Sequence, residues 1–308
     1  MLKQLSLFPD DSPPDVPEPI ETLLAQGAAL AISISGGKDG QAMLNWLAHL
    51  RRSGKWSGHC FAIHAHLGRA EWPETLAHCY QICEQAGIEL VVVHRKQGDL
   101  VDRWRERMEK LIAEGNTKPF WSSAQNRYCT SDLKRGPINK YLRRFDCVIS
   151  AEGIRGQESV KRAKQPVVSV RDEIRTSRLR ELSPEEAIAR WQNLGRLALT
   201  WHPLQHWDVS QVWEWCDTSL SEYQSRTRLF KSGQTEVALS GWTAHPAYVR
   251  GNERLSCALC ILASRNDLIN GARHNPDLYR ELVQMEQESG WKFRHDLALA
   301  DLASYLDK

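Results

Sequence analysis

The stretch Ser35-Gly36-Gly37-Lys38-Asp39-Gly40 follows an apolar run, Ala28–Ile34, and opens an amphipathic segment, Asp39–Leu50, in a chain of 308 residues. A strand, a glycine turn and a helix N-terminus in that order form a site for anions, because backbone N–H groups converge on the turn and the helix dipole adds partial positive charge. Lys38 supplies a full charge and Ser35 a hydroxyl, so this stretch, here called the glycine loop, predicts a phosphate chain as ligand. Its spacing differs from G-x-x-x-x-G-K-S/T, which excludes the common P-loop. A tight turn that needs two glycines for packing is the alternative.

Strand-like and helix-like segments alternate on both sides of the glycine loop. The expected strands are Ala28–Ile34, Cys60–Ala65, Leu90–Val93 and Cys147–Ala151, and the expected helices are Asp39–Leu50, Glu74–Ala86 and Leu100–Ala113. This alternation predicts an α/β fold, a parallel sheet with helices on both faces. Ligands of such sheets bind beyond the carboxyl ends of the strands, where Ser35–Asp39, Leu67–Arg69 and Gly153–Ser159 are expected to converge.

Five segments in this order resemble the phosphoadenosine phosphosulfate reductase family of the PP-loop ATP pyrophosphatases, an adenine nucleotide alpha hydrolase-like superfamily. The glycine loop is similar to its SGGxDS motif. The other four are Arg127–Pro137 with Cys-Thr-x-x-Leu-Lys-x-x-Pro, Gly153–Arg162 with Gly-x-Arg-x-x-Glu-Ser, Trp201–Trp213 with Pro-Leu and Val-Trp, and His245–Cys260 with a C-terminal Cys-x-x-Cys. The resemblance spans residues 28 to 262. No cysteine follows Cys260 and the Glu-Cys-Gly-Leu-His motif is missing, so the chain looks nearer to the DNA-phosphorothioation-type members than to the assimilatory reductases.

Two positions depart from the family pattern. Gly40 stands where the family usually has serine, which removes one hydroxyl ligand to phosphate. His66 stands where relatives commonly carry an aspartate near the adenosine, and an imidazole cannot accept hydrogen bonds from both ribose hydroxyls as a carboxylate does. Nucleotide specificity inherited from the family is in doubt at this position.

The resemblance implies a site for ATP or a related adenine nucleotide with Mg²⁺. Its binding residues are Ser35, Gly36, Gly37, Lys38, Gly68, Gly153, Arg155 and Arg162. Attack at the α-phosphorus with pyrophosphate leaving needs charge neutralisation more than acid–base chemistry, so Lys38, Asp39, Arg155 and Glu158 are the expected catalytic residues. Asp39 is expected to hold Mg²⁺ or orient a phosphate, and Glu158 to position Arg155 or an acceptor. The structural alternatives are a first-turn acid that stabilises the helix dipole for Asp39 and a surface ion pair for Arg155.

Eight cysteines in a long chain of this kind do not indicate a disulfide framework. Cys257-x-x-Cys260 is the expected metal or redox pair, and the resemblance, which places the Cys129 segment near the active site, implies Cys129 as the third metal ligand. A 4Fe-4S cluster with one open iron, a zinc site completed by His245, and a metal-free redox pair all remain open, because ligand counts discriminate metals poorly. The others are expected to pack in the core: Cys60, Cys79, Cys83, Cys147 and Cys216.

The chain divides by composition into three parts. Residues 1–22 are rich in Pro and acid and are predicted to be a disordered tail. Residues 23–180 are predicted to form the nucleotide-binding α/β domain, and residues 181–308 a mainly helical region with starts at Ser183 and Asn275. No signal peptide or membrane span is recognised, so a cytoplasmic protein without membrane contact is expected.

Charge and tryptophan content bear on the partners. Residues 127–180 carry 14 Lys and Arg against 6 Asp and Glu, a local excess that suits a phosphate-rich partner such as nucleic acid, or a solvated helical face. The cluster of tryptophans between Trp191 and Trp215 is interpreted as core rather than as a base-stacking platform.

Three functions remain open at this stage. The first is an ATP pyrophosphatase that adenylylates an acceptor for sulfur transfer, nucleic acid among the candidates, with a cysteine desulfurase or a thiol as sulfur donor. The second is a phosphoadenylyl-sulfate or adenylyl-sulfate reductase that uses a thiol donor, which would lack the attacking thiolate of the C-terminal motif. The third is a non-catalytic nucleotide or nucleic-acid-binding module, supported by the departures at Gly40 and His66.

Overall fold

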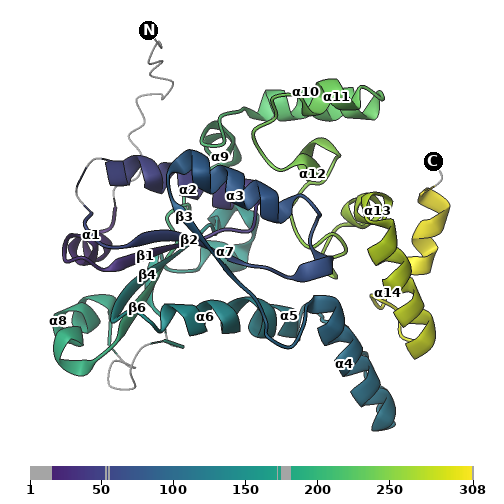
Figure 1. Ribbon diagram of the computed structural model, residues 1–308, viewed down its shortest axis with the longest axis horizontal. Helices are drawn as coiled ribbons and strands as arrows, with labels where there is room; N and C mark the ends of the chain where they lie inside the picture. The colour runs from purple at the N-terminus through teal and green to yellow at the C-terminus, as the bar shows by residue number, and fades with distance from the viewer. Residues whose placement is uncertain (1–15, 53, 55, 172, 175–181, 307–308) are drawn as a thin grey trace.

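A single six-stranded sheet organises the computed structural model, which describes residues 16–52, 54, 56–171, 173–174 and 182–306 (Figure 1). The strand order is β3-β2-β1-β4-β6-β5. The strands are β1 (Ala29–Ser33), β2 (Cys60–Ala65), β3 (Glu89–Val93), β4 (Cys147–Glu152), β5 (Val168–Val170) and β6 (Leu197–Trp201). Every neighbouring pair is parallel except β5 with β6, so the fold is α/β with one antiparallel edge strand.

Alternating side chains of the strands bury both faces of the sheet. In β1, Leu30 and Ile32 face one apolar cluster, and Ala29 and Ala31 face another, because successive residues of a strand point to opposite sides. The first cluster is completed by helices α1, α2, α3 and α9, and the second by α6. Figure 1 shows α2 and α3 above the sheet and α6 below it. The predicted parallel sheet with helices on both faces is confirmed.

The helices that the structure describes follow the chain in this order: α1 (Glu18–Ala25), α2 (Lys38–Arg52), α3 (Thr75–Ala86), α4 (Leu100–Ala113), α5 (Tyr128–Thr130), α6 (Gly136–Leu142), α7 (Val160–Ala163), α8 (Pro184–Leu194), α9 (Val209–Glu214), α10 (Leu220–Lys231), α11 (Thr235–Leu239), α12 (Pro246–Val249), α13 (Arg265–His274) and α14 (Pro276–Ser289). Short tight turns are η1 (Gly68–Ala70), η3 (Gly156–Glu158) and η5 (Leu299–Tyr305), and a wide turn, η2 (Ser131–Arg135), joins α5 to α6.

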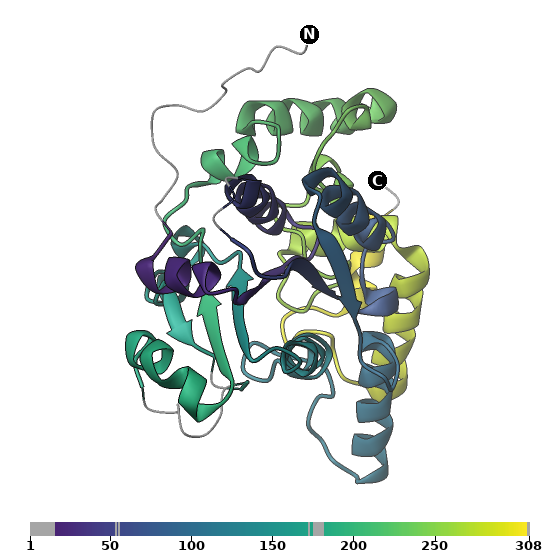
Figure 2. The same cartoon turned by 60° about the vertical axis from the view of Figure 1, so that its left-hand side comes forward.

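A third apolar cluster lies beside the sheet. It is built from α4, α13, α14 and the segment after β2, which contributes Leu67, Ala70 and Trp72. Both ribbon views place α13 and α14 next to the carboxyl-end side of the sheet (Figures 1 and 2). Segments far apart in sequence therefore share one core, and the C-terminal helices form a wall near the ends of the strands.

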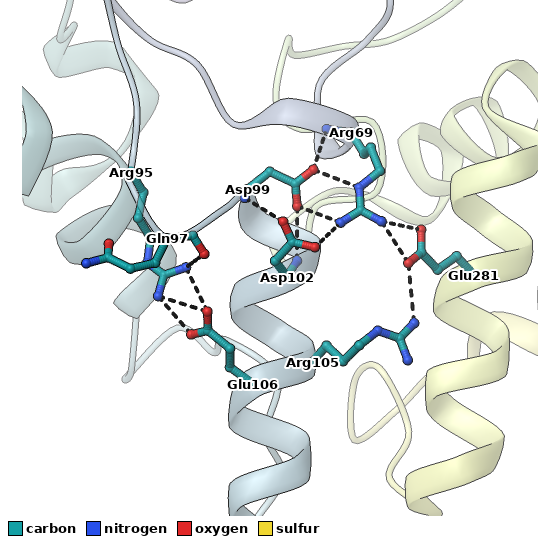
Figure 3. A network of polar contacts seen from close by, with 8 residues as sticks. All are labelled: Arg69, Arg95, Gln97, Asp99, Asp102, Arg105, Glu106 and Glu281. Carbon is teal, nitrogen blue, oxygen red and sulfur yellow. Dashed lines mark hydrogen bonds and ion pairs between the residues drawn. The ribbon is translucent and has the colours of Figure 1, made fainter.

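An ion-pair network crosses the same junction (Figure 3). The Arg69 guanidinium contacts Asp99 at 2.8 Å, Glu281 of α14 at 3.0 Å, and Asp102 of α4. Asp99 also caps α4 by accepting from the Asp102 backbone N–H at 3.0 Å. Since Arg69 belongs to η1, which follows the second strand, this network ties the strand-end turn to both helices.

Three features differ from the sequence-based expectations. Helix α1 begins at Glu18, inside the segment predicted to be a disordered tail, because Ile20, Leu23 and Leu24 bury an apolar stripe against the sheet. The rest of that prediction, residues 1–15, lies outside the described residues. Strand β6 comes from the stretch predicted to be helical, where Leu-Ala-Leu-Thr-Trp is buried between β4 and β5. The short β5 is also not anticipated by its sequence.

Several local predictions are confirmed. Helix α4 and strand β2 have the expected bounds, and α8 and α14 begin at the expected starts. Trp201, Trp207 and Trp213 are buried in the core, as are the five cysteines expected to pack there. Among the described helices, none combines the length and apolar character that crossing a bilayer requires.

Candidate functional site

One cavity of about 700 Å³ lies where the sheet strands end. The glycine loop, the ends of β1 and β4, and the C-terminal segment 253–264 surround it. Its walls include Ser33, Ser35, Gly37, Lys38, Asp39, Gly40, Leu67, Ser123, Arg127, Cys129, Thr130, Lys134, Gly153, Glu158, Arg162, Tyr248, Glu253, Arg254, Leu255, Ser256, Cys257, Cys260 and Asp267. The segments after the first, second and fourth strands therefore contribute to one site, as the parallel-sheet argument predicts.

The aromatic residue Tyr248 holds the glycine loop in place through its hydroxyl and its ring. Gly36 has φ +76°, a left-handed conformation that L side chains rarely adopt, so the turn requires glycine there. The backbone N–H of Lys38 donates to the Tyr248 hydroxyl at 3.0 Å, and the Lys38 ammonium lies 5.5 Å from the centre of that ring. One of the loop amides expected to hold phosphate is thus already bonded to Tyr248. Gly36 does not line the cavity, and a Cβ added to it would point toward the side chains of Thr75 and Leu255.

Asp39 joins two of the expected cations. Its carboxylate contacts the Lys38 ammonium at 3.1 Å and the Arg155 guanidinium on its other oxygen. Burial would raise the pKa of Asp39, but Lys38 and Arg155 outweigh it and hold that pKa below its ordinary value. Asp39 is therefore an ionised group that pairs with both cations and offsets one of their two positive charges in this conformation.

Glu158 is expected from the sequence to position Arg155 or an acceptor, but its ion pairs lie with other arginines, so only the role toward an acceptor stays a prediction. Glu158 instead contacts Arg162, four residues along the chain, and lies 4.0 Å from Arg254. Arg155 is buried behind the loop and reaches the cavity only through Asp39. The difference arises because η3 turns Glu158 toward the cavity wall, while Arg155 faces the start of α2.

Arginines crowd one wall of the cavity. Arg127, Arg162 and Arg254 line it, and Arg155 lies behind it. Burial and then the positive charges of Arg254, Arg127 and Arg155 lower the pKa of Arg162, with Asp39 opposing them. Like charges brought this close favour a bound anion, because an anion relieves their repulsion.

Cys129, Cys257 and Cys260 all line the same cavity, and their role as a shared ligand set stays a prediction. Burial raises the pKa of Cys257 to about 12, with Lys134 opposing the rise. Burial would lower the pKa of Lys134, but the charge that the three thiols can carry outweighs it and raises that pKa. Lys134 therefore lies within electrostatic reach of all three.

The spacing of the thiols bears on what they can hold. Of the described residues, only one group of three potential ligand atoms lies within 4.8 Å of one another, and it is not the three thiols. Thiolates on one tetrahedral zinc at a Zn–S distance of about 2.3 Å would be about 3.8 Å apart. In this arrangement the three thiols are therefore more widely spaced than the ligands of one bound zinc ion, and the choice between a cluster, zinc and no metal stays a prediction.

His245 is not available as a fourth zinc ligand in this arrangement. Its Nε2 lies 3.1 Å from the Thr75 hydroxyl, and its Nδ1 accepts the Ala247 N–H at 3.2 Å as the cap of α12. Both ring nitrogens are engaged, and the fully buried side chain does not line the cavity. The zinc site completed by His245 is therefore wrong.

Of the remaining predicted positions, some line the cavity and others lie outside it. Gly153 lines the cavity, and a Cβ there would press on the Asp39 backbone at 3.2 Å. Gly68 does not line it, and its φ of +67° and its approach to Asp99 give it a steric role. His66 lies outside the cavity wall and contacts Glu71 at 2.8 Å. Gly40 lines the cavity with only ordinary contacts around an added Cβ.

Sequence reasoning missed the role of two residues. Tyr248 sits in a segment that carries the resemblance, but no local pattern shows that its hydroxyl meets Lys38. Arg254 belongs to a polar stretch before the Cys-x-x-Cys pair, and only the fold brings it to Arg162. The only sequence signal for these two residues was the resemblance, whose ordered segments imply that residues 245–260 belong to the same site as the glycine loop.

Comparisons with known proteins bear on the family. A family model described as the phosphoadenosine phosphosulfate reductase domain matches residues 29–234. A search of curated protein sequences finds no match.

The solved structures that are similar to this chain include the following two. One is an FMN adenylyltransferase of Candida glabrata in complex with FMN and the ATP analogue AMPCPP, at 12% identity and a TM-score of 0.31, with 65% of this chain and 50% of that chain covered. The chain thus spans half the length of that relative. The other is the U34-tRNA thiolase NcsA from Methanococcus maripaludis with its 4Fe-4S cluster, at 14% identity and a TM-score of 0.39, with 91% of this chain and 73% of that chain covered. Because the family model covers more than half of the sequence, from β1 through α10, the chain belongs to the phosphoadenosine phosphosulfate reductase domain family.

Proposed function

We propose that this protein is an ATP pyrophosphatase-type enzyme that adenylylates an acceptor and prepares it for sulfur transfer. The observation that carries the proposal is the joint presence, in one cavity, of the glycine loop with Lys38, an arginine wall and three cysteines. A phosphate-binding group and a set of thiols in the same cavity suit a reaction that activates a carbon or phosphate centre and then delivers sulfur to it.

The residues suggest how the phosphate-binding group works. The loop and Lys38 hold the β- and γ-phosphates, and Arg162 and Arg254 neutralise charge that develops as the acceptor attacks the α-phosphorus and pyrophosphate leaves. Asp39 exchanges part of its contact with Lys38 and Arg155 for the incoming phosphates or for Mg²⁺. Arg155 then acts through Asp39, as a positioning residue.

The proposed sulfur chemistry rests on the three thiols. Cys129, Cys257 and Cys260 would hold a 4Fe-4S cluster, which when bound supplies one iron position free of protein thiolate for sulfide. Lys134 places a positive charge beside the ligands and stabilises their thiolate form. The proposed acceptor class is nucleic acid, supported by the excess of Lys and Arg in residues 127–180.

A reductase acting on a sulfonucleotide is the second candidate, and the description of the family model favours it. That reaction needs a nucleophilic thiolate beside the bound nucleotide. Cys129, Cys257 and Cys260 all line the cavity and are the candidates for this role. The two proposed functions therefore share the site and differ in the product.

The test measures pyrophosphate release from ATP by the purified, anaerobically prepared protein, with single-stranded DNA and unmodified tRNA offered as acceptors. We expect release that depends on an acceptor and falls at least 100-fold in Lys38→Ala and Arg162→Ala. Lys164→Ala is the matched control, since Lys164 is exposed next to α7 and does not line the cavity. Thioredoxin-dependent sulfite formation from phosphoadenosine phosphosulfate would replace the proposal with the reductase. Nucleotide binding without turnover under every condition would replace it with a binding module.

A further inference from the structure

A second cluster of ligand-type side chains lies outside the cavity. Potential ligand atoms of His64, His66 and Glu71 all lie within 4.8 Å of one another, and within the described part of the chain no other three His, Cys, Asp or Glu do so. The Glu71 Oε2 atom lies 3.3 Å from His64 Nε2 and 2.8 Å from His66 Nδ1. None of the three lines the cavity.

The backbone holds these side chains in place. His64 and His66 are two residues apart at the end of β2, so their side chains point to the same face. The His66 N–H donates to the Val93 carbonyl at 2.8 Å, which extends the pairing with β3 by one residue. The tight turn η1 then reverses the chain, and the Glu71 N–H donates to the Gly68 carbonyl at 3.1 Å. The resulting pattern is His-x-His followed five residues later by Glu.

The hydrogen bonds leave an unusual arrangement at His64, which is 1% exposed. Its Nδ1 lies 3.2 Å from the Ile34 carbonyl, which only accepts, so Nδ1 carries a hydrogen. Its Nε2 then faces the Glu71 carboxylate, which also only accepts when ionised. In that tautomer Nε2 is an acceptor that faces another acceptor 3.3 Å away, and a metal ion bound by both groups would satisfy them.

We propose that His64, His66 and Glu71 bind a divalent first-row transition metal ion of the Zn²⁺ type. Two imidazoles and one carboxylate are the protein ligands of many zinc sites that keep open positions for water. The bond from His64 Nδ1 to the Ile34 carbonyl is the outer-shell contact that orients a metal-binding imidazole with Nε2 toward the ion. The soft thiols across the cavity form a chemically different site.

The position of the ion has a structural consequence. It would join the last residues of β2 to the residue after η1, and Leu67, between them, lines the cavity. The same turn carries Arg69, which reaches α4 and α14 through the network of Figure 3. The ion therefore stabilises the turn that connects the sheet to the C-terminal helices. This inference does not depend on which reaction the cavity performs.

The test titrates Co²⁺ and then Zn²⁺ into the full chain carrying Cys129→Ser, Cys257→Ser and Cys260→Ser. Without these thiols, Co²⁺ binding at the cysteine site cannot contribute to the absorption. We expect one ion to bind with d–d absorption and without the strong near-ultraviolet charge-transfer band of thiolate ligands. Zn²⁺ should displace it and raise the melting temperature of the protein. In the same background, His66→Gln and Glu71→Gln should each weaken binding by at least about 10- to 100-fold, because loss of an outer-shell partner alone typically costs that much and these residues are direct ligands.

His59→Gln is the matched control, because His59 is another β2-flanking histidine that lies 3.8 Å from a single glutamate, Glu89. It should leave the affinity for Co²⁺ unchanged. Circular dichroism of the His66→Gln protein separates lost ligation from lost folding, since His66 is only partly buried. Absence of Co²⁺ binding in the cysteine-substituted chain, or binding that neither His66→Gln nor Glu71→Gln weakens, would overturn the proposal and leave the cluster as an imidazolium–carboxylate pair.

Discussion

The backbone N–H of Lys38 donates a hydrogen bond to the hydroxyl of Tyr248 at 3.0 Å, across 210 residues of sequence. Tyr248 is 2% exposed, and burial raises the pKa of its phenol, so the hydroxyl stays neutral at physiological pH. This contact anchors the glycine loop to the C-terminal region. This hydrogen bond therefore joins the glycine loop directly to the C-terminal region that also contains the Cys-x-x-Cys pair.

Replacing Tyr248 with phenylalanine tests this anchor. The change leaves the buried Lys38 N–H without its partner, so we expect the free energy of unfolding to fall by about 1–3 kcal/mol. Urea denaturation measures it. Tyr223→Phe is the control, because the Tyr223 hydroxyl lies 3.5 Å from the Asn252 carbonyl, the long limit of a hydrogen bond. Equal losses in the two variants would contradict a special role for Tyr248.

Asp39→Asn tests the electrostatic balance of the site. Without the carboxylate, Lys38 and Arg155 are no longer neutralised, so pyrophosphate should bind about 5-fold tighter in the absence of Mg²⁺, a gain of about 1 kcal/mol. Isothermal calorimetry at low salt measures the affinity, and Asp277→Asn, at a highly exposed position, is the control. Weaker binding by the Asp39→Asn protein would show that Asp39 organises the site rather than competing with the anion.

The glycines at 36 and 40 should respond differently to substitution. Gly36→Ala forces a side chain onto φ +76°, so we expect a loss of about 1–2 kcal/mol in unfolding free energy. Gly40→Ser adds a Cβ whose nearest neighbour is Ile34 Cα at 3.4 Å, an ordinary contact, within helix α2. We expect it to be neutral or to stabilise by about 0.5 kcal/mol, and its hydroxyl should tighten ATP binding. Thermal melting with and without ATP checks both, and a destabilised Gly40→Ser protein would refute the steric argument.

The pH dependence of stability should reveal the buried histidines. Burial lowers the pKa of His78 to about 4, and burial followed by the charge of His78 lowers that of His245 to about 3. The unfolded chain protonates these groups near pH 6.5. Between pH 6.5 and 4 the unfolded state therefore binds more protons, so the free energy of unfolding should fall as pH falls, by up to about 1.4 kcal/mol per pH unit and histidine. Above pH 6.5 their contribution is complete.

Urea denaturation at pH 7, 6 and 5 measures this slope. His78→Gln retains a donor for the Gln41 side-chain oxygen, which His78 Nε2 contacts at 3.2 Å, and removes the titration. Its slope should be flatter than that of the unsubstituted protein, whereas His59→Gln, at an exposed position, should change nothing. Identical slopes in His78→Gln and the unsubstituted protein would mean that other groups set the acid sensitivity.

Local patterns predicted the frame of the fold. The bounds of β2 and α4, the cap at Ser183 and the turn at Gly36 follow from side-chain periodicity, capping chemistry and backbone torsion, which are properties of a few consecutive residues. Strand β6 could not be recognised in this way, because a five-residue apolar stretch fits a buried strand and a buried helix equally well until its neighbours β4 and β5 are known.

The order of alternating strands and helices by itself placed the glycine loop and the segment Gly153–Ser159 at one edge of the sheet, whereas the inclusion of the three cysteines in that site was implied by the resemblance to the family. Only the tertiary structure decided how they pair. Asp39 meets Arg155 across 116 residues, while Glu158 turns to Arg162 and His245 is used to cap a helix away from the thiols. Such pairings depend on the packing of distant segments, and no short-range pattern of residues encodes the packing angle or the side-chain reach that selects among several nearby partners.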